Sequence, residues 1–202
     1  MQVKTIGRSG RRFLTGAILA LAMSQGAWAD SAEDKQRLAK CAKDICAIIV
    51  SKAAKGPDLS CDLTKTWDRD AIQKGADSKQ LPWGLGSAKC SVKIGAKRAD
   101  IVAALTSPAN TLKIAKQPVA CEIGEEKYAL SATMAPELNF KDGTNIGAAL
   151  RVDDIQGATL IRGAVWTVAV LEKHFGILEG DIVREVNRFV QKECPKIVSG
   201  SH

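Results

Sequence analysis

The chain reads DLSCDLTKTW over residues 58–67, and this stretch sets the architecture that the rest of the sequence has to fit. Its apolar residues Leu59, Cys61 and Leu63 alternate with polar neighbours, which is the period-two pattern of a strand with one buried face. Strands of this kind belong mainly to antiparallel sheets that leave their second face to water. We therefore expect a half-buried strand here that requires an apolar layer on one side.

The segment before this strand predicts an amphipathic helix over residues 31–54. Ser31 and Asp34 have the spacing of a capping box, and Gly56-Pro57 ends the pattern. Apolar residues recur at helical spacing at Leu38, Ala42, Ile45 and Ile49. The basic residues between them fit a solvated helix face better than a partner site.

The segments after it predict further strands. Short helices are expected at 71–75 and 100–105, and Asp142-Gly143 is a favoured hairpin turn. The expected strands are 87–95, 111–114, 119–123, 128–133, 137–140 and 146–152.

The C-terminal part returns to helical patterns. Residues 158–175 are strongly apolar and predict a buried helix, although their β-branched residues leave a strand as the alternative. A second helix is expected to begin at Asp181 and to end at Cys194, before Pro195. Its apolar stripe consists of Ile182, Val186, Phe189 and Val190. This order predicts an α+β fold, an antiparallel sheet covered by N-terminal and C-terminal helices.

All cysteines lie after residue 40, and their even number predicts disulfides. They are Cys41, Cys46, Cys61, Cys90, Cys121 and Cys194. No C-x-x-C pair is present, and the histidines are few, so zinc and dithiol redox chemistry lack their usual ligands. The connectivity stays open. The strand-like segments around Cys61 and Cys90 favour a bridge between these two, and Cys194 is expected to reach Cys41 or Cys46.

The first residues predict an export signal that is cleaved after Ala29. Residues 1–12 contain four basic residues and no acid, residues 13–23 are apolar, and Ala27-Trp28-Ala29 has small residues at the cleavage positions. The apolar run is too short to span a bilayer. General secretion is favoured, and the pair Arg11-Arg12 leaves the twin-arginine route open. We expect residues 30–202 to form one α+β domain with a short disordered C-terminal tail, located in the periplasm or secreted.

Composition narrows the function classes. The chain has 202 residues, 46 % hydrophobic and 25 % charged, which excludes a disordered or collagen-like protein. The net charge of +7 falls to +3 once the four basic residues of the signal are removed, so no nucleic-acid partner is expected. No membrane span is expected in the mature chain either.

No residue set predicts catalysis, a cofactor or a metal site. His174 lacks the partners of a hydrolase triad, and the acidic pairs are typical of solvated turns. These pairs are Asp68/Asp70, Glu125/Glu126 and Asp153/Asp154. Trp83, in a Pro/Gly loop, is the one candidate for ligand binding, by stacking on a sugar or an aromatic group, although such a Trp more often plugs the end of a sheet. Trp67 and Trp166 are expected in the core.

The sequence therefore predicts an exported, soluble, non-catalytic protein that binds a small ligand or an envelope protein. A hydrolase that uses carboxylates brought together by the fold is the first alternative. A structural accessory of an envelope complex is the second. A mainly apolar pocket would favour binding, whereas facing acids with a raised pKa would favour an enzyme.

Overall fold

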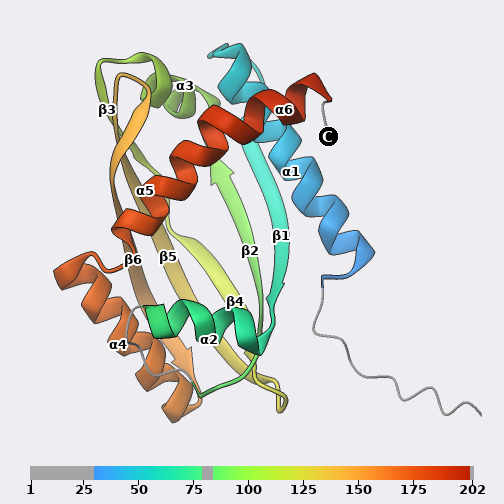
Figure 1. Cartoon of the computed structure of the whole chain (residues 1–202), viewed down its shortest axis with the longest axis vertical. Coiled ribbons are helices and arrows are strands. Elements are labelled where there is room, and N and C mark those ends of the chain that lie inside the picture. Colours follow the sequence, from blue (N-terminus) through green and yellow to red (C-terminus); the bar gives the residue numbers. More distant parts are fainter. Residues whose placement is uncertain (1–29, 79–83, 201–202) are drawn as a thin grey trace, which may run out of the picture.

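The computed structural model describes residues 30–78 and 84–200, and it confirms the α+β fold (Figure 1). The first helix begins at a capping box, as predicted: the backbone N–H of Asp34 donates a hydrogen bond to Ser31 Oγ at 3.0 Å. In chain order the elements are α1 (Ala32–Ser51), β1 (Leu59–Trp67), α2 (Arg69–Ser78), β2 (Ala88–Ala96), α3 (Arg98–Thr106), β3 (Ala109–Lys113), β4 (Gln117–Ile123), β5 (Tyr128–Lys141), β6 (Thr144–Gly157), α4 (Thr159–Phe175), α5 (Glu179–Arg188), the π-helix η1 (Phe189–Glu193) and α6 (Cys194–Ser199).

The strands form one antiparallel sheet that follows the order of the chain. β1 pairs with β2, β2 with β4, and β4 with β5, while β6 lies along the other side of β5. β3 and β4 lie end to end beside β5. The predicted turn at Asp142-Gly143 is confirmed, and both residues have positive φ as a tight two-residue hairpin requires.

Strand β5 is longer than the sequence predicts. The segments 128–133 and 137–140, expected as separate strands, form one continuous strand. Pro136 of β5 lies opposite the junction between the ends of β3 and β4. Its carbonyl accepts a hydrogen bond from the N–H of Ile114 at 2.9 Å. The N–H that proline lacks faces this junction, so no ladder hydrogen bond is lost.

The helices cover one face of the sheet, as predicted. Figure 1 shows α1, α5 and α6 across one end of the sheet and α2 and α4 at the other end. Leu59 and Cys61 of β1 belong to the core under the first group, and Leu130 of β5 belongs to the core under α4. The opposite face carries a cross-strand row in β1, β2, β4, β5 and β6 that is polar except for one alanine: Thr64, Ser91, Ala120, Ser131 and Gln156.

All six cysteines form disulfides: Cys41–Cys61, Cys46–Cys194 and Cys90–Cys121. The expected partnership of Cys194 with α1 is therefore confirmed. The expected Cys61–Cys90 bridge is wrong, because the β1–β2 register places Cys61 opposite Ile94. Cys90 lies opposite Cys121 on the next strand and bonds to it instead.

Further expectations about burial and about the end of the C-terminal helix are wrong. α4 is a helix but not a buried one, since Ile161 faces the sheet while Trp166 is 59 % exposed. Trp67 is 41 % exposed because it ends an edge strand. The C-terminal helix does not end at Cys194. It continues through η1 into α6, where Pro195 lies in the first turn and needs no N–H partner.

Candidate functional site

A cavity with almost entirely apolar walls lies under the C-terminal helical segment α5–η1. Its volume is about 360 Å³. Helix α1 contributes Ile45 and Ile49, helix α3 contributes Ile101 and Leu105, and strand β5 contributes Phe140. The floor therefore comes from the sheet, two helices form the sides, and α5–η1 forms the roof.

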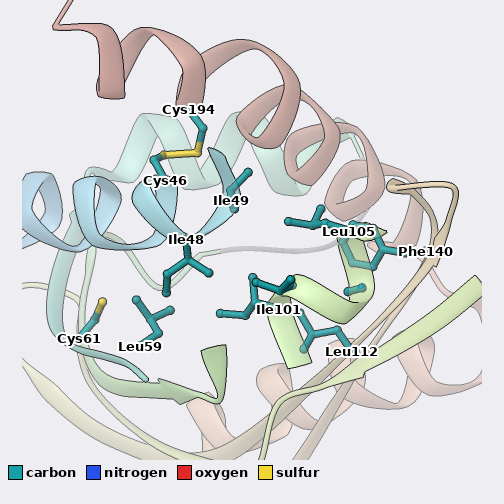
Figure 2. Close-up of a cluster of buried hydrophobic side chains, with 12 residues drawn as sticks. Cys46, Ile48, Ile49, Leu59, Cys61, Ile101, Leu105, Leu112, Phe140 and Cys194 are labelled. Carbon is teal, nitrogen blue, oxygen red and sulfur yellow. A yellow bond between two sulfur atoms is a disulfide. The ribbon is translucent and has the colours of Figure 1, made fainter. Parts of the chain in front are cut away.

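Local periodicity explains why these side chains converge. Ile45 and Ile49 are one helical turn apart, as are Ile101 and Leu105, so each pair points to one side of its helix. Figure 2 shows Ile49, Leu105 and Phe140 together beneath the C-terminal helix, although they come from three different elements. Their convergence creates a continuous apolar wall.

The roof is attached near its middle and at its C-terminal end, and its apolar side chains over the cavity are only half-buried. Asn187 of α5 accepts from the N–H of Asn145 and donates to its carbonyl, both at 2.8 Å. The Cys46–Cys194 disulfide joins the far end of the roof to α1. Val186 and Phe189, on either side of Asn187 in the chain, rest over the cavity without being fully buried. A π-helix here widens the turn, a feature that is frequent at functional sites.

The charged side chains beside the cavity wall are paired with one another. Glu185 is the one charged side chain in the described cavity wall. Its Oε1 lies 3.6 Å from Arg184 Nε, and its Oε2 lies 3.5 Å from Arg188 Nη1. Asp181 also hydrogen-bonds Arg184 and raises the pKa of this guanidinium, while Glu193 pairs with Arg188. Both arginines beside the wall are thus already paired with carboxylates, so the cavity suits a neutral molecule better than an anionic head group.

The acidic residues considered from the sequence are only partly brought together. Asp68, Glu125 and Glu126 line one open cleft of about 640 Å³, together with Arg69. Asp153 pairs with Lys116 at 2.9 Å, and Asp154 accepts a hydrogen bond from Thr133.

Two carboxylates, Asp30 and Asp153, have a lowered pKa, whereas a general acid needs a raised one. The pKa of Asp30 is lowered by a hydrogen bond from Lys65, and that of Asp153 by a hydrogen bond from Lys116. In residues 30–78 and 84–200, no group of three or more His, Cys, Asp and Glu is placed to hold a metal ion. His174 is exposed at the end of α4.

Trp83, the candidate for ligand stacking, lies outside the residues that the structure describes. The apolar cavity was not predicted as a site, because its wall residues show the same periodicity as any core. No signal in the sequence separates the lining of a cavity from the interior of a filled core.

Comparisons with known proteins add no further information: no family model, curated protein or solved structure matches this chain. Within the described residues, no helix is both long enough and apolar enough to cross a membrane. Any functional conclusion therefore depends on the geometry of the cavity.

Proposed function

We propose that this chain is a non-catalytic binding protein for a small, neutral, apolar molecule. The observation that carries the proposal is the apolar cavity under α5–η1, whose described walls contain one charged residue, Glu185, already paired with arginines. Ligand sites in proteins are typically concave and lined mainly by apolar side chains. The cavity falls within their usual range of size.

The lining of the cavity favours an apolar occupant, because filling it removes apolar side-chain surface from water. At about 30 Å³ for each non-hydrogen atom, the space suits a molecule of roughly twelve such atoms.

We also propose that the protein works outside the cytoplasm, in the periplasm or the medium. Three disulfides support this location, since they form and persist in oxidising compartments. The N-terminal pattern up to Ala29 supports export. Mass spectrometry of the protein recovered from periplasm should show a chain that begins at Asp30. Recovery of the intact N-terminus from the cytoplasm would contradict the proposal.

The binding proposal is tested with naphthalene, a neutral aromatic molecule of suitable size, and with 2-naphthoate, which adds a carboxylate. Naphthalene fluorescence titrations should show saturable binding, and 2-naphthoate should bind at least about tenfold more weakly because its charge must be desolvated. Absence of naphthalene binding, or equal binding of both compounds, would count against a neutral apolar site.

Two variants of α3 locate the binding. Ala104 is fully buried in the cavity wall, so Ala104→Leu fills part of the space and should abolish naphthalene binding. Ala99, on the same helix, is exposed, so Ala99→Leu is the matched control and should bind normally. Unchanged binding in Ala104→Leu would place the ligand elsewhere.

A hydrolase is the alternative that one observation favours, the cleft lined by Asp68, Glu125 and Glu126. Activity there requires two carboxylates across a substrate. Hydrolysis of glycoside or ester substrates that is lost in Asp68→Asn, but retained in Ala104→Leu, would support the enzyme over the binding protein.

A further inference from the structure

Glu172, near the C-terminal end of α4, is a carboxylate buried among apolar side chains. It is 5 % exposed. Its Oε2 accepts a hydrogen bond from the backbone N–H of Leu178 at 2.7 Å. Its Oε1 is also shielded from solvent, and no donor among the described residues reaches it. A buried acceptor without a donor is costly, and more so when it carries charge.

A second, smaller cavity lies at this carboxylate. It has a volume of about 150 Å³ and lies between α4 and strands β4, β5 and β6. Val165, Val168 and Ala169 face it from α4, and Val119 and Met134 face it from the sheet. Among the described residues, Glu172 is the only charged one in its walls. The cavity therefore combines apolar walls with one buried carboxylate whose Oε1 has no donor among the described residues.

We propose that this cavity binds a small tertiary ammonium ion, one N–H group that carries short alkyl substituents. The single N–H donates to Glu172 Oε1, the positive charge compensates the carboxylate, and the alkyl groups contact the apolar walls. At about 30 Å³ for each non-hydrogen atom, the space holds roughly five atoms, which matches trimethylammonium and its near homologues.

The number of N–H or O–H donors makes a single primary ammonium, water or quaternary ammonium a poorer match to one acceptor atom. A primary ammonium has three N–H donors, and two of them would face apolar walls without an acceptor. A water molecule would likewise leave one O–H unpaired, and it would fill only a fraction of the space. A quaternary ammonium has the charge and the size but no donor for Oε1.

This site is independent of the cavity under α5–η1, because the two share no wall residue among those described. Failure of one proposal therefore leaves the other intact.

The test is isothermal titration calorimetry of the full-length mature protein with trimethylammonium, tetramethylammonium and methylammonium chlorides. Trimethylammonium should bind, and the other two should bind about ten- to a hundredfold more weakly, the range expected for a hydrogen bond to a charged group. Equal affinity for trimethylammonium and tetramethylammonium would overturn the proposal, as would the absence of binding.

Variants assign the binding to the carboxylate. Glu172→Gln should weaken trimethylammonium binding by at least about tenfold, whereas Glu33→Gln, on the exposed surface of α1, should not change it. If Glu172→Gln fails to fold, Ala169→Leu decides, because it keeps the carboxylate and fills the cavity. Wild-type affinity in Glu172→Gln or in Ala169→Leu would place the ion elsewhere and overturn the proposal.

Discussion

The two ends of the helical layer are held to the sheet by different means. At one end, disulfides join α1 to β1 and to α6, and a large apolar cavity lies between them and the sheet. At the other end, α2 and α4 pack on the sheet without any disulfide between helix and strand, because Cys90–Cys121 lies within the sheet. Covalent bonds hold the end with the larger cavity, and side-chain packing holds the other.

The difference indicates how a hollow core is made stable. A cavity removes packing contacts, and a disulfide offsets the loss by restricting the unfolded chain. At the α4 end, where no such bond exists, burial of Ile161 against Leu130 and Ile123 has to supply the stability. Removing the main support at each end should therefore have effects of different origin and size.

The largest effect is expected from the double variant Cys46→Ala, Cys194→Ala. This disulfide has a sequence separation of 148, and chain entropy predicts a loss of about 5 kcal/mol. The matched control is Cys90→Ala, Cys121→Ala, with a separation of 31 and an expected loss of about 4 kcal/mol. Urea unfolding measures both free energies. A larger loss for the control would show that the long-range bond is not the main support.

Local features of this fold were accessible from the sequence. The Ser31–Asp34 capping box, the alternation in β1 and the Asp142-Gly143 turn each depend on residues that are close in the chain. Such patterns report backbone geometry directly. Together they were sufficient to predict the fold class.

Non-local features were not accessible. The expected Cys61–Cys90 bridge was wrong because the sequence pattern predicts that the two strands pair but not their register. A shift along β2 changes which side chains lie opposite one another. The burial expected for Trp166 is wrong because an apolar helix need not be covered on every side. The cavity was missed because its lining and a filled core have the same apolar periodicity.

The second prediction tests the end that is held by packing. Ile161→Ala should destabilise by about 2–4 kcal/mol, because Ile161 is 1 % exposed and its removal leaves a void under α4. Its neighbour Leu160 is 75 % exposed, so Leu160→Ala should change the stability by less than about 0.5 kcal/mol. Thermal and urea unfolding provide the comparison. Similar losses in both variants would mean that α4 is held by something other than this face.

The third prediction concerns the roof of the larger cavity. Asn187→Ala removes both hydrogen bonds to the backbone of Asn145, a buried residue, and should cost about 1–3 kcal/mol. Amide hydrogen exchange at Asn145 should accelerate in parallel, and naphthalene should dissociate faster. Asn139→Ala, which removes one exposed hydrogen bond from Thr111, should cost less than about 0.5 kcal/mol. An unchanged exchange rate at Asn145 would show that the roof is not anchored there.

The smallest effect is expected at the start of α1 and depends on pH. The side chain of Asp30 is nearly buried, and it accepts hydrogen bonds from the Lys65 ammonium and from the N–H of Thr66, which lower its pKa against the opposing effect of burial. A lowered pKa in the folded state stabilises the protein above the ordinary value of 3.8, and this contribution is lost as the pH falls through the folded-state pKa. Because Lys65 is half exposed, the contribution should be at most about 1 kcal/mol.

Asp30→Asn tests this contribution, because it keeps an oxygen for the Thr66 N–H and removes the charge. Its stability deficit should be present at neutral pH and should shrink toward zero as the solution is acidified below the ordinary pKa of the carboxyl. Asp153→Asn is the exposed counterpart: its pKa is lowered in the same way by Lys116, but solvent screens that pair, so its deficit should be smaller. Urea unfolding across the acidic range measures both variants. If cleavage after Ala29 makes Asp30 the first residue, its carboxylate also compensates the new amino group at the positive end of α1. A stability deficit of Asp30→Asn that grows on acidification would contradict both this role and the ion pair with Lys65.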